Sequence, residues 1–130
     1  MKKKILFISP TGTLDNGAEI SIVNLMEYLV QTGHQVINAI PDYHVAVQQD
    51  YISSLAALAI ETIALPSVKW WWEDAPGGLP DSPETRARSY QDNTSALRKI
   101  LTERNIDLVI TNTVNMFQGA VAAACENVPH

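Results

Sequence analysis

The chain combines short continuous apolar runs with longer stretches in which apolar residues recur at helical spacing. Ile5 to Ile8 form an uninterrupted apolar run, and over residues 18–31 the apolar positions lie three and four residues apart. A short apolar run suits a strand buried on both faces of a parallel sheet, and the second pattern predicts an amphipathic helix. Gly33 then stands where a helix can close in the left-handed conformation. The chain therefore opens with a strand, a turn and a helix.

The same succession of patterns continues along the rest of the chain. It predicts strands at 34–40, 62–65 and 108–110, and helices at about 45–58, at about 82–105 and from Asn112 or Thr113, as the cap, to about Glu126. Residues 66–83 carry four prolines and two glycines, which predict a long loop. Loops of this length in compact domains are commonly functional.

Strands that alternate with helices predict an α/β fold, a doubly wound Rossmann-like parallel sheet flanked by helices. We expect one Rossmann-like domain over residues 1–130, with strand order 3-2-1-4. In such sheets ligands bind at the switch point, where the connections from two neighbouring strands run in opposite directions. Here the first and fourth strands are those neighbours, so we expect a binding site between the loops Ser9 to Gly17 and Thr111 to Asn115. Val128 to His130 stand where a fifth strand would begin, so we expect the domain to be incomplete at its C-terminus.

Composition and charge exclude several classes of protein. Apolar residues make up 46% of the chain and charged residues 18%, which is typical of a globular protein. The net charge is −5 and the only basic run is Lys2 to Lys4, so we expect no nucleic-acid partner. The single cysteine, Cys125, cannot form an internal disulfide, and we expect it to pack in a helix as a small hydrophobic residue. Without a signal peptide or a membrane-spanning run, the chain is expected to be cytoplasmic.

The first loop, SPTGTLDNGAEIS, has two glycines at a spacing that suggests phosphate binding. Gly12 and Gly17 keep the spacing of a P-loop, but Ala18 and Glu19 replace the lysine and the hydroxyl residue that bind phosphate and magnesium. The dinucleotide fingerprint fails as well, because Leu14 stands where its middle glycine should be. What remains is a glycine-containing turn that exposes amides at a helix N-terminus, which is a general anion site.

A purely structural interpretation of this loop is equally open from the spacing alone. Asn16 can be the N-cap of the helix, with Glu19 three positions later completing a capping box. Gly17 then only fits the first turn, and nothing binds there.

A family resemblance favours a binding role. The segments that carry it are Asn16-Gly17-Ala18-Glu19, Asn24-Leu25, Gly33-His34-Gln35-Val36 and IDLVITNT at 106–113. In this order they resemble the N-terminal domain of family-4 glycosyltransferases, retaining enzymes of the two-domain GT-B type, most clearly over residues 2–40 and 104–130. Asn16 departs from the glycine of the family pattern, a mild change because asparagine also tolerates unusual backbone angles.

The resemblance implies a function for the complete protein. A sugar would move from a nucleotide-sugar donor to a saccharide or lipid-linked acceptor with retention, as in a hexosyltransferase of carbohydrate biosynthesis. The implied donor-phosphate contacts are Gly12, Asn16, Gly17, Ala18 and Glu19. Most of the nucleotide-sugar site would lie in a second, C-terminal domain that is absent from this chain, so the chain alone is expected to be inactive. No cofactor other than this substrate is implied, and no metal cluster is visible in the sequence.

Several further residues are candidates for acceptor binding. Asp15 can bind an acceptor hydroxyl, act as a base towards it, or serve only as a turn residue. Trp71, in the run Trp70 to Trp72, can stack on a sugar or touch a lipid-linked acceptor at the inner face of the membrane, or the run can anchor the long loop. Three polar residues of the loop after the fourth strand complete the set: Asn112, Thr113 and Asn115.

Two other classes of protein compete with the transferase interpretation. Ser9, Thr11 and Gly12 are similar to the phosphate loop of a flavodoxin-like FMN electron carrier, with the tryptophans flanking the flavin, although Leu14 replaces a phosphate-binding hydroxyl. A receiver-like module is the third interpretation, and the chain lacks the acidic pair that such a module places after its first strand. No catalytic residue is assigned.

Overall fold

The protein folds as one parallel sheet with helices on both faces. The computed structural model describes residues 2–72, 76, 78 and 81–130. Strands and helices alternate along the chain: β1 (Lys4–Ile8), α1 (Gly17–Gln31), β2 (Gln35–Pro41), α2 (Ala46–Ala57), β3 (Glu61–Leu65), α3 (Pro83–Glu103), β4 (Leu108–Thr111) and α4 (Gln118–Cys125). All neighbouring strands pair in parallel in the order β3-β2-β1-β4, which confirms the predicted class and topology.

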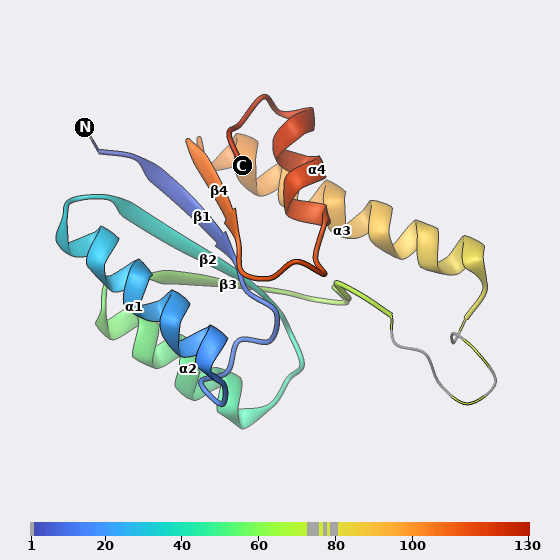
Figure 1. Ribbon diagram of the computed structural model, residues 1–130, viewed down its shortest axis with the longest axis horizontal. Coiled ribbons are helices and arrows are strands. Elements are labelled where there is room, and N and C mark those ends of the chain that lie inside the picture. Colours follow the sequence, from blue (N-terminus) through green and yellow to red (C-terminus); the bar gives the residue numbers. More distant parts are fainter. Residues whose placement is uncertain (1, 73–75, 77, 79–80) are drawn as a thin grey trace.

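The helices form two layers around the sheet. Figure 1 shows α1 and α2 on one face and α3 and α4 on the other. Strand β1 contributes side chains to the core on both faces of the sheet, because alternate residues of a strand point to opposite faces. Ile5 and Phe7 pack with α1 and α2, whereas Leu6 and Ile8 pack with α3 and α4. This double burial explains why the first strand is an unbroken apolar run.

The start of the last helix differs from the sequence prediction. Neither Asn112 nor Thr113 caps α4, which begins only after Phe117 and has no side-chain cap. The two polar residues are engaged elsewhere: the Asn112 side chain lies 3.4 Å from the carbonyl oxygen of Ala18, and Thr113 bonds with Asn115 inside the loop. A polar residue after a strand is therefore not a sufficient signal for a helix start.

The expectation that Cys125 packs as a small hydrophobic residue is wrong. Cys125 is the last residue of α4 and is exposed. The helix instead buries Ala122 and Ala123 against the sheet, and the helical period carries Cys125 away from that face.

The last residues of the chain return to β4. The carbonyl oxygen of Pro129 accepts a hydrogen bond from the amide of Val109 at 2.9 Å, and Thr111 Oγ1 lies 2.8 Å from His130 Nε2. Within the described part of the chain, no helix has the length and apolar character needed to cross a lipid bilayer. Part of the predicted long loop, at 73–75, 77 and 79–80, lies outside the described residues.

Candidate functional site

The loops after β1 and β4 meet at the carboxyl edge of the sheet, as the strand order predicts. Pairing between the two strands extends beyond them, because the amide of Asn112 donates to the carbonyl oxygen of Ile8 at 2.9 Å. The Asn112 side chain then reaches the first turn of α1 at Ala18. The β1–α1 loop and the start of the β4–α4 loop therefore form one continuous surface at the switch point of the sheet.

Gly12 allows the β1–α1 loop to pass close to the neighbouring strand. Its φ is +71°, and a β-carbon there would lie 2.5 Å from Ile40 Cδ1 of β2. Both the left-handed backbone and the close approach favour glycine. Gly12 thus shapes the loop. A side chain at this position would point at Ile40, in the core.

A buried polar network fixes the beginning of this loop. Ser9 donates its amide to the carbonyl of Ala39 at 3.0 Å and its hydroxyl to Asn38 Oδ1 at 2.8 Å. Asn38 Nδ2 in turn donates to the Tyr51 hydroxyl of α2 at 2.6 Å. Burial raises the pKa of Tyr51 to about 12, and the charge of nearby Glu19 acts in the same direction. The phenol therefore stays neutral and rigidly placed beneath the loop.

Gln48 ties the loop to the end of β2. This α2 side chain is 2% exposed, and its Nε2 donates to the carbonyl oxygens of Thr11 and Pro41, both at 2.7 Å. Its Oε1 accepts from the amide of Tyr43 at 2.8 Å. One amide side chain thus satisfies three backbone groups, which is the pairing that buried polar groups require.

The N-terminus of α1 presents two amides to the surface. Asn16 is the N-cap, and its Oδ1 accepts from the amide of Glu19 at 3.0 Å, as the structural interpretation of the loop predicted. The amide of Ile20 bonds to the Asn16 carbonyl. The amides of Gly17 and Ala18 have no hydrogen-bond partner among the described residues, and both residues are exposed. A β-carbon added at Gly17 would meet nothing within 4 Å.

Glu19 does not complete the capping box and instead binds back to the loop. Its Oε1 accepts from the amide and the hydroxyl of Thr11 at 3.1 and 3.0 Å. The side chain is fully buried, and its Oε2 has no hydrogen-bond partner. Burial raises the pKa of Glu19, an effect that hydrogen bonds from Thr11 and Gly12 offset in part. The carboxyl group thus holds the loop from inside, at a position where its negative charge is disfavoured.

The other predicted site residues of these two loops lie at the surface. Asp15 accepts hydrogen bonds from Thr13 Oγ1 at 2.7 Å and from Asn16 Nδ2 at 3.1 Å, and the bond from Thr13 is the main reason why its pKa is lowered. Thr113 and Asn115 form a turn in which the Asn115 amide donates to Thr113 Oγ1 at 3.2 Å. Both loops therefore expose polar groups beside the α1 N-terminus.

The tryptophans do not act as one group. Trp70 is 2% exposed, and its Nε1 donates to the carbonyl oxygen of Ser9 at 3.1 Å, so it anchors the segment after β3 to the β1–α1 loop. Trp71 is half-buried and packs against the core on the α3 and α4 face. Lys69 Nζ lies 4.2 Å from the centre of the Trp72 ring. The anchor interpretation is thus confirmed for Trp70.

Sequence reasoning did not single out the residues that support the loop from below. Asn38, Gln48 and Tyr51 are buried, and each bonds to the loop or to a partner of the loop. A signal was present for Asn38, a polar residue within an apolar strand pattern, because such a residue needs a buried partner. Gln48 and Tyr51 lie on a helix whose pattern is weakly amphipathic, so their burial is not readable from spacing.

This architecture is that of a Rossmann-like α/β domain, and solved structures share it. They include a glycosyltransferase from Rickettsia africae ESF-5 (TM-score 0.66, 18% identity, 98% of this chain and 28% of that one). MurG of Acinetobacter baumannii is similar at TM-score 0.63 and 15% identity, over 97% of this chain and 34% of that one. A deacetylase of the teicoplanin biosynthesis pathway is similar at TM-score 0.68 and 16% identity, over 96% of this chain and 64% of that one.

These similarities establish the fold of the chain and do not establish its activity. The chain spans less than two thirds of each of these three proteins, and two of their names state different activities, a glycosyltransferase and a deacetylase. No family model and no curated protein matches the sequence. Among residues 2–72, 76, 78 and 81–130, no three or more histidine, cysteine, aspartate or glutamate side chains are grouped so that they could hold a metal ion.

Proposed function

We propose that this chain is the N-terminal, acceptor-side domain of a retaining, GT-B-type glycosyltransferase of family 4. The complete protein transfers a hexosyl group from a nucleotide sugar to a saccharide or lipid-linked acceptor, and a second domain completes the donor site. The sequence resemblance at 16–19, 24–25 and 33–36 supports this proposal, as does a fold shared with several glycosyltransferases. In this proposal the chain by itself does not catalyse transfer.

The observation that carries the proposal is the open N-terminus of α1 at the switch point. The amides of Gly17 and Ala18 lack partners among the described residues, and the space beside Gly17 is open. Amides at a helix N-terminus, together with the helix dipole, favour a phosphate group. During transfer the leaving nucleoside diphosphate gains negative charge, and preorganised amides of this kind lower the barrier by stabilising it.

The buried carboxyl of Glu19 limits which amides can serve the donor. The amide of Thr11 is already bonded to Glu19, so the anion site reduces to the first turn of α1. An ionised Glu19 would repel a phosphate bound there. Burial raises its pKa and so favours the neutral form, which lessens this repulsion. Gly12 contributes by shaping the loop, and Asn16 by capping the helix below the two open amides.

The flavodoxin-like alternative is less well supported. A flavin carrier needs an aromatic face free to stack on the isoalloxazine ring. Trp70 is almost completely buried with its indole bonded to Ser9, and Trp71 packs against the core. We keep Asp15, Trp71, Asn112, Thr113 and Asn115 as proposed acceptor contacts, of which all but Trp71 lie in the two loops at the switch point.

The proposal is tested by adding nucleoside diphosphate sugars to the isotope-labelled chain and following its backbone amide signals by NMR. We expect changes concentrated at the amides of Gly17 and Ala18 and at residues 112–115, with weak affinity because one domain supplies only part of the site. The matching free sugars serve as controls and should leave these amides unchanged. Signals at Gly17 and Ala18 that do not respond to any nucleotide sugar would overturn the donor-phosphate assignment.

A further inference from the structure

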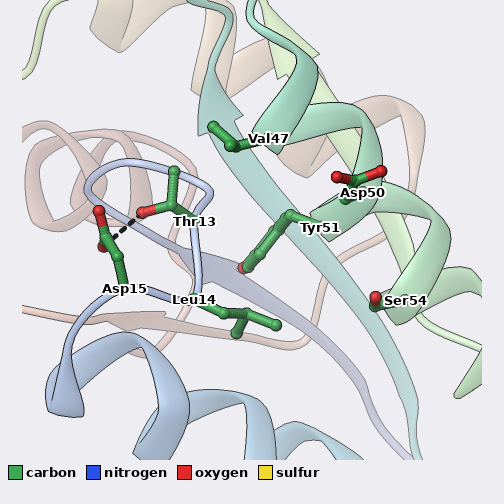
Figure 2. A pocket seen from close by; sticks show the side chains of 7 residues that line it. All are labelled: Thr13, Leu14, Asp15, Val47, Asp50, Tyr51 and Ser54. Atoms are coloured by element: carbon green, nitrogen blue, oxygen red, sulfur yellow. Dashed lines mark hydrogen bonds between the residues drawn. The ribbon is translucent and has the colours of Figure 1, made fainter.

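A pocket lies between the β1–α1 loop and α2. It has a volume of about 290 Å³. Figure 2 shows its seven lining residues, three from the loop and four from one face of the helix: Thr13, Leu14, Asp15, Val47, Asp50, Tyr51 and Ser54. The volume lies at the lower end of the range for ligand pockets, so it suits a single small ring.

The pocket carries two carboxylates and no basic residue. Asp15 belongs to the loop and Asp50 to α2, and Figure 2 shows them on opposite sides of the pocket. One oxygen of Asp15 already accepts from Thr13 and Asn16, and its pKa is lowered, so it stays ionised. Asp50 has no hydrogen bond or ion pair with any described residue. Carboxylates accept hydrogen bonds and donate none, so a ligand here must bring donors, and a cation fits best.

The remaining lining residues suit the apolar face of a sugar ring. Leu14 and Val47 are 44% and 57% exposed, so a ligand would cover apolar surface that now faces solvent. Tyr51 is committed through its hydroxyl to Asn38, and only its ring is left to line the pocket. Ser54 adds a hydroxyl that can donate and accept. A ring with an apolar face, hydroxyls at its edge and one positive charge matches this combination.

We propose that this pocket binds an amino sugar, with its ammonium group on Asp50 and its hydroxyls on Asp15 and Ser54. Asp50 takes the charge because it is the carboxylate without a partner in the described structure. The requirement for a cation rests on the pocket alone, and the choice of a saccharide, as the acceptor, rests on the proposed function.

Binding is measured by NMR titration of the chain at about pH 6, where carboxylates are ionised and sugar amines protonated. The probes are glucosamine, glucose and cyclohexylamine. We expect glucosamine to shift the amides of residues 13–15 and 47–54, and glucose and cyclohexylamine to bind at least about tenfold more weakly, because each lacks one part of the match. Asp50→Asn should weaken glucosamine binding about tenfold, and Asp92→Asn, an exposed change on α3 across the sheet, should not.

Equal binding of glucose and glucosamine, no binding of glucosamine, or an unchanged affinity in Asp50→Asn would each overturn the cation site. Cyclohexylamine that binds as tightly as glucosamine would overturn the assignment to a sugar. Failure of the proposed function shows at different signals, because nucleotide sugars are followed at Gly17 and Ala18 and amino sugars along α2.

Discussion

Gly12 and Gly17 border the same loop, yet the structure gives them different roles. Gly12 combines a φ of +71° with a close approach to Ile40. Gly17 is the first residue of α1, has no positive φ, and has open space where a side chain would project. Gly12 is therefore required by the fold, whereas Gly17 leaves room for a ligand.

Replacing each glycine by alanine separates the two roles. Gly12→Ala should lower the free energy of unfolding by at least about 1 kcal/mol, because the side chain meets Ile40 in a backbone conformation that favours glycine. Gly17→Ala should stay within about 0.5 kcal/mol of the wild type. Urea unfolding followed by circular dichroism measures both. Equal losses in the two variants would contradict the distinction.

Glu19 links the loop to the pH dependence of stability. Burial raises its pKa above the ordinary value of 4.5, so the folded state holds this proton to a higher pH than the unfolded state does. The contribution of the neutral carboxyl is then complete below pH 4.5 and is lost as pH rises through the raised pKa. Asp15, the nearby acid of the same loop, adds to the effect by repulsion.

Glu19→Gln removes this titration and keeps an acceptor for Thr11. The unfolding free energy of the wild type, relative to this variant, should fall as pH rises above 4.5. Urea unfolding at a series of pH values measures the difference. Glu84→Gln, an exposed glutamate in the first turn of α3, is the control and should show no such trend. A relative stability that is constant or rises with pH would contradict the burial of a neutral carboxyl.

At the scale of elements, α4 packs closely against the sheet because Gly119 has no side chain. A β-carbon at Gly119 would lie 2.4 Å from Ile8 Cδ1 and 2.8 Å from Thr111 Oγ1. The helix backbone therefore lies directly on β1 and β4, the two strands of the switch point. Gln118 adds a polar tie, because its Nε2 donates to the carbonyl oxygen of Trp70 at 2.7 Å.

Gly119→Val should force α4 away from the sheet. Overpacking of this kind costs about 1–3 kcal/mol, and the displaced helix should also perturb the β4–α4 loop. Ala124→Val places the same side chain at an exposed position of the same helix and should cost less than about 1 kcal/mol. Thermal unfolding compares the two variants, and similar melting temperatures would contradict the tight packing at Gly119.

The predictability of each element followed the strength of its local signals. The first strand and helix were predicted to within a residue, because an apolar run, an Asn cap and a closing glycine all agree there. The long helix α3 was also placed well: it was predicted at about 82–105, and the structure has it at Pro83–Glu103, where Ser82 is the N-cap. The start of α4 was not, since Phe117 has no capping side chain and Gly119 reveals its role only through contacts with distant strands.

At the scale of the whole molecule, the sequence pattern predicted the strand order and the edge at which the two loops meet. Rules of connection and handedness leave few topologies for alternating strands and helices, so the edge at which the two loops meet could be predicted before their contacts were known. The supporting network could not be placed in the same way. Asn38, Gln48 and Tyr51 come from three elements and meet only after the sheet and α2 have packed.

The central claim is that the N-terminus of α1 faces the phosphates of a nucleotide sugar. The most direct measurement is calorimetry of sugar-nucleotide binding to the proposed two-domain protein, comparing the wild type with Gly17→Val and, as a control, with Gln31→Val at the far end of α1. The space beside Gly17 is open in the fold, so its valine variant should fold normally and bind at least about tenfold more weakly, while Gln31→Val binds like the wild type. Equal affinity of Gly17→Val and the wild type would contradict the account.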